Sequence, residues 1–165
     1  MFWFWNKKSI EELISDNDFS GILDHCKNGA LTWSNQETAS FLYNIANQVG
    51  QYYNNNELAI KLYKESIKYN ENDPTVYNNL ATAYKRLSDY ENSILFYNKA
   101  LNLDSKNPIR YLRPAFLYAY IWKNNEAVNL LKKYFDIWWN DISFIELCKN
   151  TTQWWNELLK LYNTF

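Results

Sequence analysis

The sequence repeats itself with a period of 34 residues. When the chain is shifted by that distance, Asp73-Pro74 falls on Asn107-Pro108 and Ala81 falls on Ala115. Five further pairs coincide at the same shift: Tyr77 with Tyr111, Tyr84 with Tyr118, Ser93 with Ala127, Ile94 with Val128, and Tyr97 with Leu131. A third copy lies upstream, and its matching residues are Ala59, Ile60, Tyr63, Ser66 and Ile67. A fixed period of this length predicts a stack of two-helix units, because one such unit cannot bury its apolar face alone.

Each copy is predicted to form a helix, a short turn and a second helix. In the middle copy, Asp73 can cap the first helix, with Pro74 at the first helical position, where a missing N–H costs nothing. The apolar residues then recur at helical spacing: Tyr77, Leu80, Ala81 and Tyr84. Ser88-Asp89 ends this helix and offers the next cap. The second helix repeats the stripe with Ile94, Tyr97, Ala100 and Leu101. Small residues at Ala81 and Ser93 would let the two backbones approach closely.

Further helices are predicted on both sides of the middle copy. Ser9 and Ser34 each begin a capping box with a glutamate three residues later, Glu12 and Glu37. Asp18 can cap a helix that Asn28-Gly29 would end. The first helix of the first copy fits best with an apolar stripe of Leu42, Ile45, Ala46 and Val49, which implies one extra residue around 54–56. Two more helices, 141–148 and 152–162, are expected to cover the last apolar face with Trp154, Leu158, Leu159 and Tyr162. About ten helices and no sheet are therefore expected.

The pattern resembles the tetratricopeptide repeat, whose motif places aromatic, Leu-Gly, aromatic and small residues at fixed offsets. The middle copy matches it at Tyr77, Leu80-Ala81, Tyr84, Ser93, Tyr97 and Ala100. The resemblance covers roughly residues 39–140 and implies an all-α, right-handed helical solenoid. We expect one domain over 1–165, with N-terminal helices in 1–33, three repeats in 34–140 and capping helices in 141–165. Glu71 and Ser105 replace the family proline, and Pro114 stands at a leucine position, so the helix there is expected to start late or kink.

Composition narrows the functional classes. Three glycines and three prolines argue against a β-rich fold. The formal net charge is -1, and lysine and arginine form no run longer than a pair, so the sequence shows no basic patch for nucleic acid. The N-terminus places aromatics before lysines, the wrong order for an export signal. The longest other apolar run, 114–122, is far shorter than the ~20 residues that span a bilayer. We expect a cytoplasmic protein without stable membrane insertion.

The sequence also shows no catalytic constellation. His25 adjoins Cys26, but neighbouring residues on a helix point about 100° apart, so the two side chains are not brought together. Cys148 is distant, and the two cysteines are expected to be buried thiols rather than a disulfide. A metal site would need three or four converging ligands, and no phosphate-binding or hydrolase motif occurs. The chain is therefore predicted to be non-enzymatic, with no catalytic residues, no cofactor and no metal.

Some of the eight tryptophans need a separate explanation. Consecutive residues cannot both face one core, so one member of Trp138-Trp139 and one of Trp154-Trp155 should be exposed or covered by the capping helices. We expect the capping helices to cover these side chains. The segment Phe2-Trp3-Phe4-Trp5 has three open roles: packing against the solenoid, engaging a partner, or touching a membrane surface.

The family resemblance implies a binding face. In such proteins the first helix of each repeat lines a concave groove. By position, the groove residues here are Tyr43, Asn44 and Asn47 from the first repeat, Asn78, Asn79, Thr82 and Arg86 from the second, and Arg110 and Arg113 from the third. Some members clamp a carboxylate with five residues, and Asn47, Asn79 and Arg113 match three of those positions. Tyr43 and Ile109 replace the two lysines, and asparagine is common at its positions in repeats of every specificity. The groove is polar and suits the main chain of an extended peptide.

Two functional classes follow from this face. The first is an adaptor or chaperone that binds a protein or peptide partner in the groove. The layout of leading helices, three repeats and a helical cap is similar to that of the small type III secretion translocator chaperones. The alternative is an immunity protein that neutralises a bacterial toxin through a folded surface. The size and slight acidity of the chain fit both classes.

Overall fold

The computed structural model describes residues 8–29 and 33–138, and every regular element in these ranges is a helix. The contacts divide the chain into two compact units, Met1–Ser105 and Lys106–Phe165, which are described separately. The prediction of an all-helical chain is confirmed for the described residues. The prediction of one domain stays a prediction.

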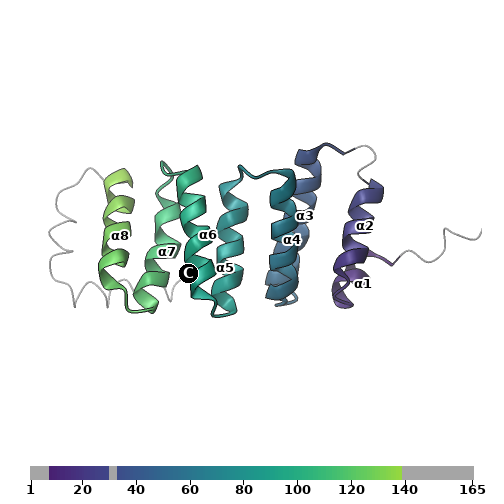
Figure 1. The fold of residues 1–165 in the computed structure, drawn as a ribbon, viewed down its shortest axis with the longest axis horizontal. Helices are drawn as coiled ribbons and strands as arrows, with labels where there is room; N and C mark the ends of the chain where they lie inside the picture. The colour runs from purple at the N-terminus through teal and green to yellow at the C-terminus, as the bar shows by residue number, and fades with distance from the viewer. Residues whose placement is uncertain (1–7, 30–32, 139–165) are drawn as a thin grey trace, which may run out of the picture. The chain divides into compact units, whose positions relative to one another are not determined.

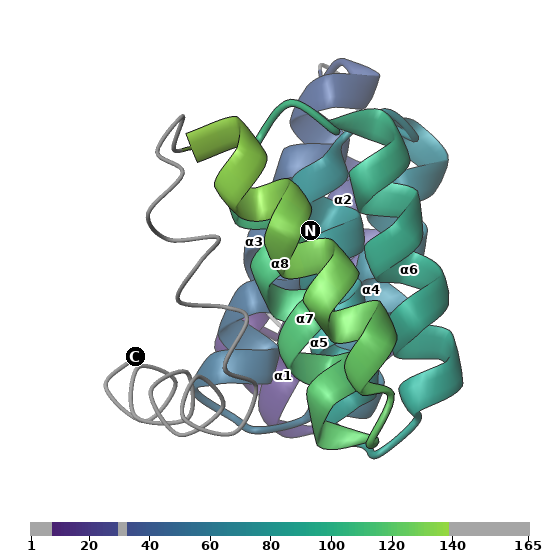
Figure 2. The same ribbon diagram turned by 90° about the vertical axis from the view of Figure 1, so that its left-hand side faces the viewer.

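The first unit contains six described helices and the second contains two (Figure 1). Their bounds are α1 Ile10–Ser15, α2 Phe19–Gly29, α3 Asn35–Gln51, α4 Asn56–Tyr69, α5 Pro74–Arg86 and α6 Tyr90–Leu103, then α7 Ile109–Tyr120 and α8 Asn124–Trp138. Within the first unit, α3 pairs with α4 and α5 pairs with α6, while α4 also packs on α5. Figure 2 shows α4 and α6 on the same side of this unit, with α3 opposite. Helices α7 and α8 form the third pair.

The predicted caps are present at the helix starts. The Ser9 and Ser34 side chains each accept a hydrogen bond from the backbone three residues later, and each closes a complete capping box. Asp73 accepts from Thr75 N at 2.8 Å and Pro74 is the first helical residue, as predicted. Asp18 Oδ1 accepts from Gly21 N at 2.8 Å. These local hydrogen bonds fix where the helices begin, so the helix pairs have the register that the period requires.

The predicted apolar stripes form the core of the first unit. All four stripe residues of α3 and all four of α5 are buried. On α6, Tyr97, Ala100 and Leu101 are buried, while Ile94 is half-buried. The close approach expected at Ala81 and Ser93 is present, because Ser93 Oγ donates to the Ala81 carbonyl at 2.8 Å. Cys26 is buried as a free thiol, as expected.

The turn inside each helix pair contains one residue in the left-handed region. These residues are Asn17, Asn54, Ser88 and Trp122, with φ between 51° and 63°. Between α3 and α4 the turn holds Tyr53 as an additional residue, compared with the α5–α6 turn. The extra residue predicted around 54–56 is therefore confirmed, one position earlier.

The second unit departs from the pattern at its first helix. Helix α7 begins at Ile109, one residue later in the period than α5, which begins at Pro74. Asn107 Oδ1 still accepts from Ile109 N, at 3.2 Å, as Asp73 does from Thr75. The helix continues through Pro114, which is buried. Because Pro114 lies inside the helix, it does not delay the start of α7, and the predicted late start is limited to one residue; the kink stays a prediction.

Several predictions fall outside the described residues. They include the helices 141–148 and 152–162, the capping residues Trp154, Leu158, Leu159 and Tyr162, the segment Phe2–Trp5, and Trp139, Trp155 and Cys148. Among the described helices, none has both the length and the apolar character that crossing a bilayer requires.

Candidate binding face

Hydrogen bonds join the predicted groove residues of the first two repeats. Asn79 Nδ2 on α5 donates to Tyr43 Oη at 3.1 Å and to Asn47 Oδ1 at 3.0 Å, and both acceptors lie on α3. Tyr63 Oη on α4 donates to the same Asn47 Oδ1 at 2.6 Å. Three of the predicted residues thus form one network across adjacent first helices.

This network leaves one donor group and one acceptor group unused. Both hydrogens of Asn79 Nδ2 are engaged, and Asn47 Oδ1 already accepts twice. The Asn47 amide nitrogen and the Asn79 amide oxygen have no hydrogen-bond partner among the described residues. Neither side chain is fully buried. An amide donor beside an amide acceptor is complementary to the C=O and N–H of a peptide group.

The second repeat carries a related pair. Thr82 Oγ1 lies 3.0 Å from Tyr97 Oη and donates to the Asn78 carbonyl at 2.9 Å. Thr82 and Tyr97 occupy the repeat positions of Asn47 and Tyr63. At the same positions in the second unit stand Phe116 and Leu131, which pack in an apolar cluster. The polar pair is therefore a feature of the first unit.

The other predicted residues differ in exposure. Asn44 and Arg86 are exposed, and Arg86 Nη1 donates to the Gly50 carbonyl at 2.9 Å. Asn78 is only 8% exposed, so its side chain is largely withdrawn from the face. On α7 of the second unit, Arg113 is exposed and Arg110 is half-buried.

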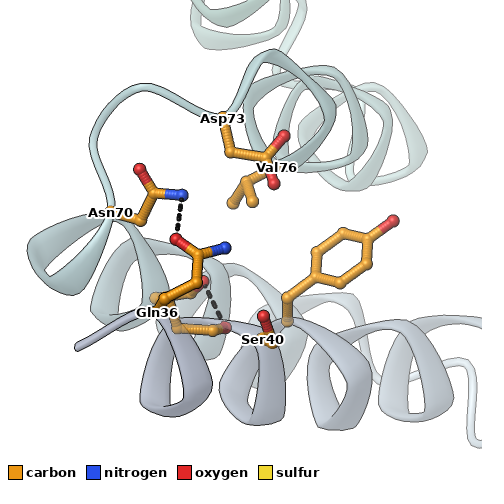
Figure 3. A pocket seen from close by; sticks show the side chains of 8 residues that line it. Gln36, Ser40, Asn70, Asp73 and Val76 are labelled. Atoms are coloured by element: carbon orange, nitrogen blue, oxygen red, sulfur yellow. Dashed lines mark hydrogen bonds between the residues drawn. The ribbon is translucent and has the colours of Figure 1, made fainter. Parts of the chain in front are cut away.

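A small pocket adjoins the network (Figure 3). It is lined by Gln36, Ala39, Ser40 and Tyr43 of α3, Ser66 and Asn70 from α4 and its end, and Asp73 and Val76 at the start of α5. Asn70 Nδ2 donates to Gln36 Oε1 at 3.0 Å, and Ser66 Oγ donates to the Ala39 carbonyl at 2.8 Å. The enclosed space is only about 30 Å³, whereas cofactor and ligand pockets span roughly 300–1,000 Å³, so this pocket is too small for a cofactor.

Sequence reasoning missed the pocket and the role of Tyr63. The polar pocket residues come from three helices, and no local motif joins them. The role of Tyr63 could have been found from a pattern shared by the first two repeats. In both, a polar residue follows the small residue of the first helix, as in Ala46-Asn47 and Ala81-Thr82. A tyrosine stands four positions after the small residue of the second helix in the same two repeats, at Tyr63 and Tyr97.

The surroundings of Cys26 do not favour its reactivity as a nucleophile. Burial raises the pKa of the Cys26 thiol, and the negative charge of Glu65 adds to this, so the thiol is a poor nucleophile at neutral pH. The His25 ring stacks on Phe41, with centroids 6.2 Å apart. In the described part of the chain, no three His, Cys, Asp or Glu side chains converge as metal ligands would.

Comparison with known proteins agrees with the repeat architecture. A family model described as "Tetratricopeptide repeat" matches residues 74–107, and one described as "TPR repeat" matches residues 53–88. Residues 53–107 therefore match tetratricopeptide repeats. The matched segments include the α3–α4 turn, α4, α5 and α6, which are the elements that carry the caps and stripes described above.

Several solved tetratricopeptide structures are similar to the chain. One is the type III secretion translocator chaperone SycD of Yersinia enterocolitica, with 20% identity over 78% of this chain and 96% of that chain, and a TM-score of 0.60. The second TPR of Spaghetti (RPAP3) is 21% identical over 62% of this chain and 94% of that chain, with a TM-score of 0.57. The Arabidopsis OM64 TPR domain is 24% identical over 63% of this chain and 85% of that chain, with a TM-score of 0.58. No curated protein matches the sequence. At these identities the likeness is one of fold, and the predicted all-α solenoid is confirmed as the fold class.

Proposed function

We propose that the chain is a non-enzymatic adaptor or chaperone that binds an extended segment of a partner protein across α3 and α5. The observation that carries this proposal is the unused amide pair of Asn47 and Asn79, held in place by Tyr43 and Tyr63. Because the network fixes both amides before binding, little side-chain entropy is lost when a peptide group pairs with them.

Similar solved structures support a role in protein binding. The second TPR of Spaghetti was solved bound to the HSP90 peptide SRMEEVD, and SycD is a secretion translocator chaperone. The present chain has Tyr43 and Ile109 at the positions of the two clamp lysines. Tyr43 Oη accepts from Asn79, and neither residue can supply a positive charge. We therefore propose recognition of a main chain rather than of a terminal carboxylate.

The proposal can be tested with peptides selected against the chain from a random twelve-residue library. In a selected peptide, N-methylation at each position in turn removes one backbone donor. We expect one or two positions to lose about 5- to 30-fold in affinity, the effect of one or two hydrogen bonds. Amidation of the peptide C-terminus should have little effect.

Variants of the protein locate the site. Asn44→Ala removes an exposed side chain from the same face, and we expect several-fold weaker binding with unchanged stability. Lys61→Ala on α4 is the matched control, because Lys61 is exposed on a second helix. If Lys61→Ala abolished binding and Asn44→Ala had no effect, the partner would use the opposite side, and the toxin-inhibitor hypothesis would be preferred.

A further inference from the structure

Three turns of the first unit meet at one edge. Asn55 Nδ2 in the α3–α4 turn donates to Asn17 Oδ1 in the α1–α2 turn at 3.2 Å. Arg86 Nη1 at the end of α5 reaches the Gly50 carbonyl at the end of α3 at 2.9 Å. Figure 1 shows these turns at the lower end of the unit. We call residues 15–18, 51–57 and 86–91 the turn edge.

The turn edge exposes large apolar side chains. Tyr52 is 81% exposed, Tyr53 48% and Leu87 43%. Single exposed apolar residues are normal, but several at one edge mark an interaction surface. Tyrosine is also enriched at binding hot spots. These side chains lie outside the buried stripes of α3 and α5, so packing of the described core does not account for them.

The same edge is acidic. Its residues include one cation, Arg86, and Lys8 adds a second beside Asp16, against five carboxylates: Asp16, Asp18, Glu57, Asp89 and Glu91. Asp16 is paired with Lys8 at 2.6 Å, and Asp18 and Asp89 cap helices. Glu57 and Glu91 are exposed and form no ion pair among the described residues. A surface that combines apolar side chains with negative charge attracts cationic ligands and repels anionic ones.

We propose that the turn edge is a second docking surface, separate from the α3–α5 face, for a basic amphipathic segment of a partner protein. Apolar side chains of the segment cover Tyr52, Tyr53 and Leu87, and its lysines or arginines lie near Glu57 and Glu91. Charge complementarity selects this occupant over an acidic segment or an anionic lipid surface. The inference goes beyond the proposed function, because the residues that would contact the segment are not among those of that face: Tyr52, Tyr53, Leu87, Glu57 and Glu91.

A designed peptide tests the surface directly. The probe is a fluorescent sixteen-residue peptide of leucine and lysine at helical spacing, and its leucine–glutamate counterpart is the control. Anisotropy is measured with the full chain at low and high salt. We expect the lysine peptide to bind, the glutamate peptide not to bind, and added salt to weaken the interaction. Failure of the lysine peptide to bind, or equal binding of both peptides, overturns the proposal.

Paired variants show whether the peptide lies on the turn edge. The double change Tyr52→Ser and Tyr53→Ser should weaken binding about tenfold, as for hot-spot residues. Glu57→Gln with Glu91→Gln should weaken it about threefold and reduce the salt dependence. Asn44→Ala should leave it unchanged. The edge variants should still bind peptides selected for the α3–α5 face, so the two proposals can fail independently. Undiminished lysine-peptide binding by both edge variants overturns this one.

Discussion

The buried tyrosine hydroxyls of the first unit differ in whether they have a hydrogen-bond partner. Tyr63 Oη donates to Asn47, whereas Tyr77 Oη is buried with no partner in the described part of the chain. An unsatisfied buried hydroxyl costs about 1–3 kcal/mol. We therefore predict that Tyr77→Phe raises the free energy of unfolding by about 1 kcal/mol, measured by urea denaturation. The phenylalanine ring keeps the stacking on Phe96 and the contact with Lys99.

Tyr63→Phe is the matched control for this change. It removes a hydroxyl of the same kind, but one that donates to Asn47 at 2.6 Å. We expect a loss of about 1 kcal/mol. If Tyr77→Phe were as destabilising as Tyr63→Phe, the Tyr77 hydroxyl would have a partner after all.

Two helical glycines should respond to alanine in opposite directions. A Cβ at Gly50 of α3 would lie 3.4 Å from Ala59 Cβ, an ordinary contact. Alanine there should gain roughly 0.5–1 kcal/mol, because glycine loses more backbone entropy in a helix. A Cβ at Gly21 of α2 would lie 2.5 Å from Leu13 Cδ2 and 2.7 Å from the capping carboxylate of Asp18. Gly21→Ala should lose about 1–3 kcal/mol. Thermal melts of both variants test this prediction. It would be contradicted if the two substitutions changed the melting temperature in the same direction.

Residues with local partners were predictable from the sequence, and residues with distant partners were not. The Ser9 and Ser34 capping boxes join residues three apart, so their spacing was visible in the chain. Asn79 meets Tyr43 across 36 positions, and the face residues could be assigned only through the family resemblance. The sequence could not show that Asn79 uses its donors within the fold. For this reason Asn44, which has no such bond, is the better variant for a binding test.

At the scale of elements, the period predicted the helix pairs correctly because each pair repeats the same contact. Ala46 and Ala81 are both fully buried where their pairs pack. The sequence did not show that α7 would continue through Pro114. The polar pair of the first two repeats and its apolar replacement at Phe116 and Leu131 became clear only from the structure.

The helix register can be tested at the closest approach of α5 and α6. Ser93 Oγ lies 2.8 Å from the Ala81 carbonyl, so Ala81→Leu would insert three carbon atoms where no space exists. Such overpacking costs about 1–3 kcal/mol. From the sequence, Thr82→Ala is expected to cost little stability. With the structure, the expected loss of stability for Thr82→Ala becomes about 1 kcal/mol, because Thr82 Oγ1 lies 3.0 Å from Tyr97 Oη and this hydrogen bond would be lost.

Thermal melts of the two variants rank them. We predict that Ala81→Leu has the lower melting temperature, and that its effect extends to α3 and α4, since α4 packs on α5. The reverse ranking would show that the inner and binding faces of α5 are wrongly assigned. The proposed contacts of the α3–α5 face would then have to be withdrawn.

At the scale of the whole molecule, the sequence predicted the architecture but not the partner. A stack of similar helix pairs depends on apolar positions that recur at a fixed period, and such a period can be seen in a single sequence. A binding preference depends on which polar groups stay unused after folding, and that requires the hydrogen-bond pattern. The amide nitrogen of Asn47 and the amide oxygen of Asn79 are such groups.

The two units should differ in local stability. Helix α7 contains Pro114, which has no backbone N–H to donate to the carbonyl four residues earlier, and α8 packs on α7. Helices α3 to α5 have a proline only at the first position of α5, where no such hydrogen bond is lost. A helix that lacks an internal hydrogen bond opens at lower free energy than an uninterrupted one. We therefore predict that α7 and α8 exchange amide hydrogens faster than α3 to α5, measured by mass spectrometry on peptides from each helix. Equal protection in the two units would mean that they unfold as one cooperative body, as the prediction of one domain requires.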